Sequence, residues 1–381
     1  MKCRDANNIE RHRYVTKIQK RLAIFLPSLN GGGAEHAMLN LAHGLSERGL
    51  SVDLVLAQAK GPYLANVRKS LRLVDLKASR VLLSLPELVR YLRRERPEAL
   101  LSALDYANIT ALWARRLAGL PIKAVVNEQN TISRSANNSA RRRQKIVPYL
   151  AKRFYPWSDG IVAVSEGVAG DLSQVLGVPR EEIRVIFNPV VTPELHQKAQ
   201  GPLNHPWFKV GQPPVVLAIG RLTVQKDFPT LIQAFARVRQ RQSARLVILG
   251  EGPDRPILET LVNELDIDEE VALPGFVENP YAYLGRASLY VLSSRWEGLP
   301  TVLIEALCCG VPIISTDCPS GPREILADGH YGSLVPVENV AALAEAIESG
   351  LAGDTPRPTV ESWRPYTQKT VVDQYINLFE I

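Results

Sequence analysis

The chain is predicted to fold as two α/β domains, each a doubly wound parallel sheet, facing each other across a cleft. From about residue 22 onward, short apolar runs alternate with stretches of helical periodicity. This alternation is typical of parallel strands joined by crossover helices. The pattern stops in a Pro- and Gly-rich segment at 189–214 and then restarts. A length of 381 residues also suits two domains better than one.

The elements of the first half follow from these runs in order. An apolar run at 22–26 predicts a strand, which three glycines separate from a helix at 34–48 that Gly49 ends. After it we expect strands at 52–56, 99–102, 124–126, 161–164 and 184–187, and helices at 86–94 and 107–117. The segment 189–214 shows neither periodicity and is predicted to be a linker.

The second half repeats the arrangement. Its predicted strands lie at 215–219, 246–249, 289–292 and 313–315, with helices at 230–239, after Pro300 and at 363–381. Ligands of such folds bind at the carboxyl ends of the strands, so the site is expected between the two sheets.

Composition narrows the possible classes of protein. No stretch of 18 uninterrupted apolar residues is present, so no spanning helix is expected. Residues 1–21 are polar and charged without a signal-peptide core, and are predicted to be a disordered leader. Four cysteines form neither a disulfide nor a zinc pattern, which favours a reducing cytoplasm. The adjacent Cys308 and Cys309 are expected to be small buried apolar residues.

Charge is divided unevenly along the chain. The net charge is +6, but residues 1–205 hold 31 Lys and Arg against 17 Asp and Glu, whereas residues 206–381 hold 14 against 22. The dense spots are Arg90, Arg93, Arg94 and Arg96; Arg115 and Arg116; and Arg141, Arg142 and Arg143 with Lys145, Lys152 and Arg153. Any single cluster is explained by a solvated helix face; together they favour docking on an anionic membrane surface. No zinc-finger or RNP-like signature points to nucleic acid.

The most informative motif places two carboxylates, Glu297 and Glu305, eight residues apart around a Gly-Leu-Pro turn. Pro300 fits the first position of a helix and Gly310 fits its end. Glu297 should then lie in the loop before the helix and Glu305 on its second turn. The N–H groups between them form an anion site. We expect Glu297 to bind sugar hydroxyls, Glu305 ribose hydroxyls and the helix end a diphosphate.

These features resemble the retaining glycosyltransferases of family 4, which have the GT-B fold. The resemblance rests on the E-x7-E motif at 297–305, the G-R-L-x-x-x-K block at 220–226 and the G-G-A-E loop at 32–35. Val164-Ser165-Glu166 and Asn188-Pro189 match two lesser marks. The likeness covers residues 22 to about 350, with the motifs in the family's order.

The resemblance and the residue chemistry together give a donor site. Arg221 and Lys226 should stabilise the charge that builds on the leaving diphosphate, and with Glu297 they form the predicted catalytic set. By resemblance, the backbone at 275–277 holds the nucleobase edge, with Phe276 near the ring. The donor-binding residues expected are Gly32, Gly33, Gly220, Phe276, Val277, Gly298, Leu299, Thr301 and Glu305.

The acceptor side is less defined. Glu35 and His36 follow the glycine loop and are candidates to line it, although a lone histidine is more often structural. Asp105 could orient the acceptor or simply cap a helix. Gln129 occupies the position at which many relatives have a histidine that contacts the donor sugar. Glutamine can bind a hydroxyl but cannot take a proton.

No metal or other cofactor is expected. Asp266-Ile267-Asp268 is a D-x-D sequence, which binds manganese in GT-A transferases. It continues into Glu269-Glu270 near a predicted helix end, so an acidic solvated turn is the better interpretation.

The function expected is transfer of a hexose or N-acetylhexosamine from a UDP- or GDP-sugar to a membrane-associated, lipid-linked glycan acceptor. The chain would act on the inner face of the cytoplasmic membrane. Domains are predicted at 22–203 for the acceptor and 204–362 for the donor, with 363–381 crossing back to the first. Two alternatives remain open: a non-catalytic nucleotide-sugar-binding subunit, motivated by Gln129, and a sugar-nucleotide epimerase or phosphorylase on the same architecture.

Overall fold

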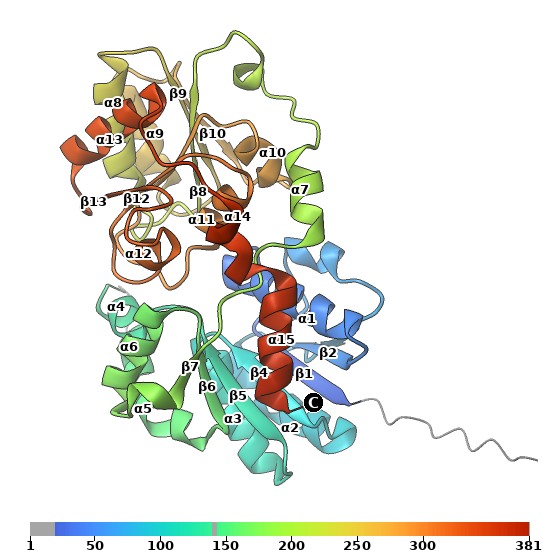
Figure 1. Ribbon diagram of the computed structural model, residues 1–381. Coiled ribbons are helices and arrows are strands. Elements are labelled where there is room, and N and C mark those ends of the chain that lie inside the picture. The colour runs from blue at the N-terminus through green and yellow to red at the C-terminus, as the bar shows by residue number, and fades with distance from the viewer. Residues whose placement is uncertain (1–19, 139–142, 381) are drawn as a thin grey trace, which may run out of the picture.

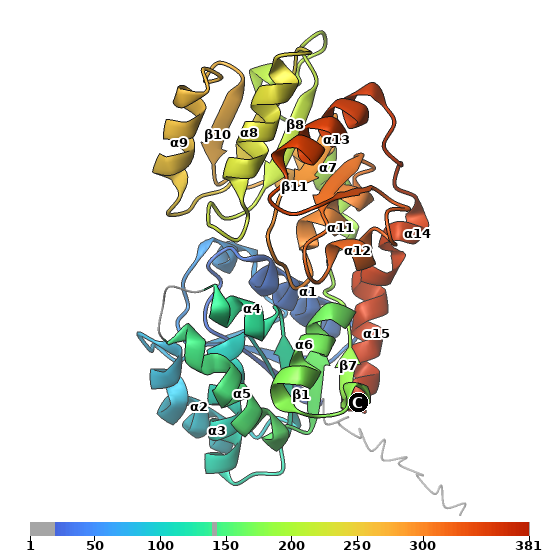
Figure 2. The same ribbon diagram turned by 90° about the vertical axis from the view of Figure 1, so that its left-hand side faces the viewer.

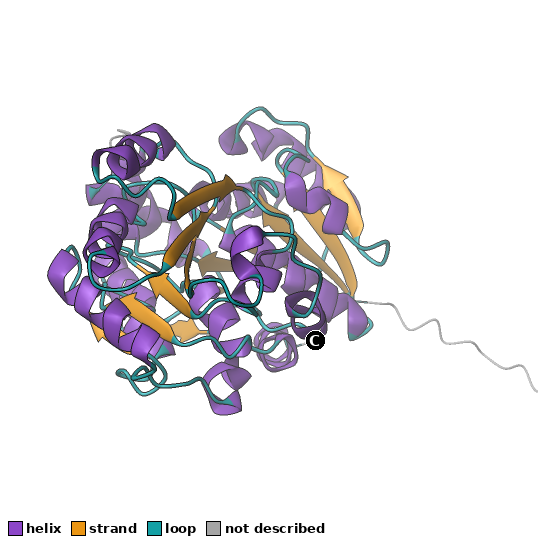
Figure 3. Cartoon of the chain, turned by 90° about the horizontal axis from the view of Figure 1, so that it is seen from above, coloured by secondary structure: helices purple, strands orange, loops and turns teal. Residues whose placement is uncertain are grey.

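A computed structural model describes residues 20–138 and 143–380, and it contains two parallel sheets (Figure 1). The strand order is β3-β2-β1-β4-β5-β6-β7 in the seven-stranded sheet and β10-β9-β8-β11-β12-β13 in the six-stranded sheet. Helices flank the strands of both sheets (Figure 3). The two doubly wound domains predicted from the sequence are therefore present. The predicted leader at 1–21 falls almost entirely outside the described residues.

The first sheet and its helices occupy most of the first half of the chain. Its strands are β1 (Arg21–Leu26), β2 (Ser51–Leu56), β3 (Arg72–Asp75), β4 (Ala99–Ala103), β5 (Lys123–Glu128), β6 (Gly160–Ala163) and β7 (Ile183–Val185). Its helices are α1 (Gly33–Glu47), α2 (Leu85–Glu95), α3 (Asp105–Ala118), α4 (Ile132–Asn137), α5 (Val147–Phe154) and α6 (Glu166–Leu176).

The second sheet follows the same plan. Its strands are β8 (Val215–Ile219), β9 (Arg245–Leu249), β10 (Val271–Gly275), β11 (Leu289–Leu292), β12 (Ile313–Thr316) and β13 (Ser333–Val335). The remaining helices are α7 (Pro193–Ala199), α8 (Phe228–Arg239), α9 (Arg255–Glu264), α10 (Pro280–Leu284), α11 (Thr301–Cys308), α12 (Pro322–Ile325), α13 (Val340–Ala352), α14 (Val360–Trp363) and α15 (Gln368–Phe379).

The segment 189–214 is not the plain linker that its composition predicted. It contains α7, which begins at Pro193 and packs against α10 of the second domain. Leu195 is buried in the core there. A helix of seven residues is too short to show a clear period, because it completes only two turns.

Alternate residues of β1 face opposite layers of helices. Leu22 and Ile24 contribute to a core that α1 and α15 cover, whereas Ala23 and Phe25 contribute to one that α2 and α3 cover. Side chains of a strand point alternately to its two faces. A central strand buried on both faces therefore appears in the sequence as one continuous apolar run.

The last helix, α15, returns from the second domain to the first and lies along α1 (Figure 2). Val371, Val372 and Tyr375 are buried in the same core as β1 and β2. The Tyr375 hydroxyl accepts a hydrogen bond of 2.6 Å from Asn127 Nδ2 at the end of β5. The helix begins at Gln368, later than predicted, because residues 364–366 form a separate 3₁₀ turn around Pro365.

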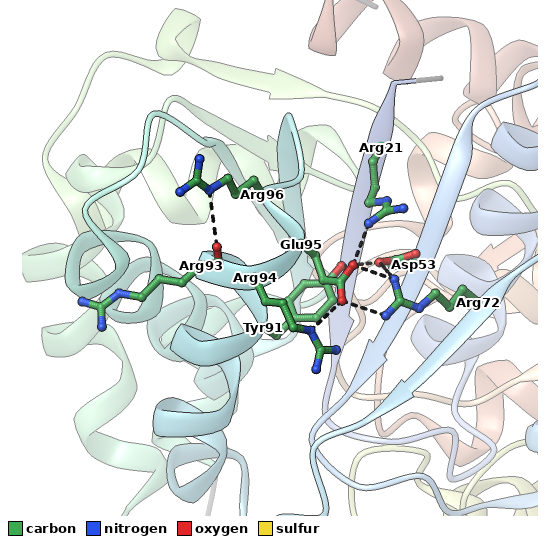
Figure 4. A network of polar contacts seen from close by, with 8 residues as sticks. All are labelled: Arg21, Asp53, Arg72, Tyr91, Arg93, Arg94, Glu95 and Arg96. Atoms are coloured by element: carbon green, nitrogen blue, oxygen red, sulfur yellow. Dashed lines mark hydrogen bonds and ion pairs between the residues drawn. The ribbon is translucent and has the colours of Figure 1, made fainter. Parts of the chain in front are cut away.

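An ion-pair network around Glu95 connects strands β1, β2 and β3 to helix α2 (Figure 4). Its carboxylate accepts hydrogen bonds from Arg21 at 2.7 Å and from Arg72 at 2.8 and 2.9 Å. Hydrogen bonds from Arg72, the largest cause, and from Arg94 lower the pKa of Glu95 to about 2. The buried Asp53 accepts a hydrogen bond of 2.7 Å from the Tyr91 hydroxyl.

The arginines at the end of α2 are largely used within their own domain. Arg94 bonds to Glu95, Arg93 donates to the carbonyl of Leu117 at 2.8 Å, and Arg90 pairs with Glu87. This cluster, predicted as part of a membrane-facing surface, therefore also stabilises the first domain.

Replacing Tyr375 tests how strongly α15 stabilises the first domain. Tyr375→Ala removes a fully buried ring and the partner of Asn127, so we expect a loss of about 3–5 kcal/mol and a clearly lower Tm in thermal unfolding. The exposed neighbour Gln374→Ala on the same helix is the control and should leave Tm almost unchanged. Equal Tm values for the two variants would show that α15 is only loosely attached.

Candidate active site

Two helices from different domains meet at their N-termini. α1 follows the glycine loop after β1, and α11 follows the Glu297–Pro300 loop. Neither N-cap residue, Gly32 or Pro300, has a side chain that bonds to the first turn. A Cβ on Gly33 would lie 2.8 Å from the Thr301 hydroxyl, so the two first turns are in close approach. The positive ends of two helix dipoles therefore face one point, which favours an anion.

The helix after the E-x7-E loop differs from its prediction by one position. Pro300 is the N-cap residue and Thr301 is the first helical residue, because the backbone of Pro300 is extended. Glu305 still lies on the second turn, and the helix still ends before Gly310, whose φ is +72°. Leu299 is buried within the loop and packs into the core.

Glu297 and Lys226 form a buried ion pair. Lys226 Nζ lies 2.6 Å from Glu297 Oε1, and the Ser294 hydroxyl donates to the same oxygen at 2.6 Å. Glu297 is only 6% exposed. The Lys226 stem lies over Gly220, where a Cβ would approach it to 3.1 Å. Lys226 and Glu297, for which separate roles were predicted, thus form one unit, because removal of Lys226 would leave the buried Glu297 carboxylate without its ion-pair partner.

Glu305 lies among aromatic side chains. It is 7% exposed, and burial raises its pKa to about 7, although a hydrogen bond with Tyr281 acts in the opposite direction. Tyr63, from the first domain, has its own pKa raised to about 12 by burial and by the charges of Glu305 and Glu35. Tyr63 also stacks on His36 with ring centroids 5.0 Å apart. Burial lowers the pKa of His36 to about 4, so its ring is neutral near pH 7.

Phe276 is an exposed residue beside the glycine loop. Its ring is 53% exposed, and a ring carbon is 3.8 Å from the position of a Cβ on Gly31. Val277 packs against the core beneath it. An exposed aromatic ring next to the glycine loop suits stacking of a planar base.

Gln129 does not present a free amide to the cleft. Its amide oxygen accepts from Asn188 Nδ2 at 2.8 Å, and its Nε2 donates to Asn127 and Asn188. The residue is buried. Its role as an acceptor ligand therefore stays a prediction that would require this network to rearrange. The same network reaches α15, because Asn127 also bonds to Tyr375.

Asp105 belongs to a carboxyl pair with Glu128, a residue that the sequence did not single out. The two lie at the ends of β4 and β5, and burial raises the pKa of both. Glu128 accepts a hydrogen bond of 2.7 Å from the Tyr155 hydroxyl, and Asp105 accepts one from Gln144. Leu104, just before Asp105, has a φ of +79°, which is strained for leucine.

The domains touch directly beside the site. The Ser165 hydroxyl donates to the Gly298 carbonyl at 2.8 Å, and Ser320 donates to the same oxygen at 2.9 Å. Glu324 accepts from the backbone N–H of Glu166 at 3.0 Å. A Cβ on Gly298 would overlap the carbonyl of Gln129. Ser165 was noted in the sequence only as part of a short motif; its contact with a residue 133 positions away has no local signal.

Comparison with known proteins identifies two families along the chain. Residues 31–193 match Glycosyltransferase Family 4, and residues 204–370 match Glycosyl transferases group 1. A Campylobacter jejuni N-acetylgalactosaminyltransferase that acts on a diphospho-undecaprenol substrate is 30% identical over 348 residues, 88% of this chain and 91% of that protein. A lipopolysaccharide core biosynthesis glycosyltransferase of Rhizobium meliloti is 28% identical, over 91% of this chain and 95% of that one.

Solved structures show the same fold at lower identity. HepE of Anabaena, crystallised with UDP and glucose, has a TM-score of 0.76 at 17% identity, covering 95% of this chain and all of that one. The outer-core galactosyltransferase WaaB gives 0.68 at 19% identity, covering 95% and 99%. Within the residues described, no helix has the length and apolar character to cross a membrane.

The contact between Glu324 and α6 should make stability depend on pH. Burial raises the pKa of Glu324 to about 7, and the neighbouring charges are Glu166 and Arg180. A carboxyl with a raised pKa in the folded state stabilises fully below its unfolded pKa of about 4.5, and that stabilisation is lost as pH rises through about 7. We expect Tm to fall between about pH 5 and pH 8 in the wild type, and Glu324→Gln to reduce that fall.

Glu305 contributes to the same trend, so the variant should reduce the dependence without abolishing it. Glu345→Gln, at an exposed position on α13, is the matched control. An unchanged pH profile in Glu324→Gln would mean that this carboxyl is solvated and does not hold the domains together.

Proposed function

The chain belongs to the family 4 glycosyltransferases of the GT-B fold, and from this membership we propose its reaction: a hexose or N-acetylhexosamine passes, with retention of configuration, from a UDP- or GDP-sugar to a lipid-linked glycan acceptor. The pathway is synthesis of a cell-surface polysaccharide. Relatives over most of the chain include a transferase acting on a diphospho-undecaprenol substrate and a lipopolysaccharide core enzyme. The observation that carries the proposal is the meeting of the α1 and α11 N-termini beside Lys226 and Glu297.

Each part of the donor has a matching group in this arrangement. The diphosphate lies at the N-terminus of α11, where Lys226 and Arg221 offset its charge. The ribose hydroxyls bind Glu305, the base lies against Phe276, and the sugar hydroxyls bind Glu297. As the bond between the anomeric carbon and the phosphate oxygen breaks, negative charge grows on the diphosphate, so cations fixed there stabilise the transition state more than the ground state.

The acceptor proton needs a destination other than Gln129. In the proposed reaction the acceptor hydroxyl oxygen bonds to the anomeric carbon on the face that the phosphate leaves, and its proton passes to the departing phosphate oxygen. No side-chain base is required, which agrees with the engagement of Gln129 in amide hydrogen bonds. A non-catalytic binding subunit remains the alternative to test.

We propose that no metal takes part. The D-x-D sequence at Asp266–Asp268 lies in the turn between α9 and β10, before the amino end of that strand. The site lies at the carboxyl ends of the strands, at the opposite edge of the sheet. These carboxylates are therefore too remote to bind a metal ion together with the donor diphosphate.

The basic face of the first domain is proposed to meet the membrane around α5. Tyr149 is 71% exposed and Ile146 is 50% exposed. Ile146 follows the exposed Lys145, and Tyr149 precedes the exposed Lys152 by three positions. Arg153 lies over the rings of Phe154 and Trp157, 5.6 Å from each centroid. Exposed apolar side chains among cations suit an anionic lipid surface. Arg141 and Arg142, part of the predicted cluster, lie outside the described residues.

A donor screen with EDTA present tests the proposed function. We expect one UDP- or GDP-sugar to raise Tm and to be turned over slowly without metal. Glu305→Ala should weaken that donor by about tenfold or more, because a charged hydrogen bond to ribose is lost. Glu264→Ala, exposed on α9, is the control. Binding without turnover, even with lipid acceptors, would favour the binding subunit, and no response to any donor would contradict the site.

Vesicle binding tests the membrane surface. Replacing Lys145, Lys152 and Arg153 by Gln should weaken binding to vesicles containing anionic lipid by about tenfold or more, at about 1 kcal/mol per cation. Replacing Lys209, Arg237 and Arg357 of the second domain makes the same change in charge at exposed positions and should have little effect. Equal losses in both variants would mean that net charge, and not this surface, governs the binding.

A further inference from the structure

Glu35 folds back over the start of its own helix. It is the third residue of α1, and the backbone at Gly32 and at Glu35 itself lies close enough to its carboxylate to lower the carboxylate's pKa, against the larger opposite effect of burial. A Cβ on Gly32 would overlap Glu35 Oε2, so the carboxylate lies directly against the glycine loop. An acidic side chain in the first turn is a common cap, but this one caps a helix end that faces the cleft.

The surroundings of this carboxylate are those of the proposed donor site. Arg221 from the second domain lies on the same side of the loop, with a guanidinium nitrogen 3.8 Å from the Cβ position on Gly32. Arg221 lowers the pKa of Glu35, while burial, the larger effect, raises it. Tyr63 is the other titratable group that senses its charge. The Glu35 carboxylate thus lies against the backbone at the start of α1 and faces a cation, as a bound phosphate would.

The start of α11, the other helix end at this site, has no carboxylate of its own first turn lying against it. At α11, Pro300 offers no capping group, and the Lys226 charge is held by Glu297, which the sugar hydroxyls are proposed to contact. Of the two helix ends that converge, only the α1 end is therefore occupied by an anionic side chain of its own first turn. A diphosphate that reached both helix ends would compete with Glu35 for the same N–H groups and for Arg221.

We propose that Glu35 is an internal stand-in for a phosphate of the donor, and that this carboxylate leaves the start of α1 when a diphosphate binds. The inference rests on the proposed function and adds a competing residue to its donor site. Glu35 is a positioning residue: it keeps the glycine loop and Arg221 in place before the donor arrives. It also lowers the affinity for any anion that cannot displace it.

Calorimetric titration of Glu35→Gln tests this competition. Glutamine keeps the length and one acceptor oxygen of glutamate but loses its charge. UDP or GDP should therefore bind to the variant about tenfold more tightly than to the wild type, and inorganic pyrophosphate should show the same gain. Glu35→Asp keeps the charge on a shorter arm that cannot reach Gly32, and its affinity should lie between the two. Glu47→Gln, at the far end of α1, changes net charge equally and should bind as the wild type does.

The outcomes separate this inference from the proposed function. Weaker or unchanged binding of pyrophosphate to Glu35→Gln, with a normal Tm, would overturn the stand-in role even if the enzyme transfers sugar. Tighter pyrophosphate binding in a protein that binds no nucleotide would support the stand-in role and contradict the donor assignment. An equal gain in affinity in Glu47→Gln would mean that the loss of net charge, and not the position of Glu35, causes tighter binding. That result would overturn the proposal. Absence of anion binding in every variant would overturn it as well.

Discussion

The whole arrangement depends on one close approach of backbone between the domains. Gly298 lies so near the carbonyl of Gln129 that a Cβ would overlap it, and an antiparallel bridge joins Gly298 to Asn130. Its own carbonyl accepts hydrogen bonds from Ser165 and Ser320, so both sides contribute to the contact. Because Glu297 precedes Gly298 directly and α11 begins at Thr301, three residues after it, this contact sets where the proposed sugar-binding carboxylate and the proposed anion site lie relative to the first domain.

A second constraint is electrostatic. Each of the two cations proposed to be catalytic faces a carboxylate: Lys226 is paired with Glu297, and Arg221 acts on Glu35. Glu305 has its pKa raised to about 7 by burial. A buried site with several cations and no anions would carry a large desolvation cost, and carboxylate partners offset that cost. In the proposed function these partners are also the groups that a sugar or phosphate would engage or displace, so the charge balance of the fold and the proposed recognition of the donor use the same residues.

Much of the fold and of the candidate site could be predicted from the sequence because the signals were local. Continuous apolar runs gave the central strands, and the spacing of Glu297 and Glu305 around Pro300 placed one carboxylate before the helix and one within it. The edge strands β3, β10 and β13 carry partly exposed residues and left no such run. Glu128 and Tyr63 escaped notice, and Ser165 was noted only within a short motif, since their importance arises from partners far away in the chain. The amide network around Gln129 likewise depends on Asn188, 59 positions away.

The return of α15 to the first domain has a consequence for biosynthesis. The face of β1 and β2 that α1 shares with Val371, Val372 and Tyr375 stays incomplete until the final helix has been translated. A ribosome adds about 5–20 residues per second, so the first domain waits for the synthesis of the entire second domain before its core can close. During that interval an apolar face is open to other chains, which makes the nascent protein a natural client for chaperones. Docking of α15 is therefore the step that closes this core of the first domain.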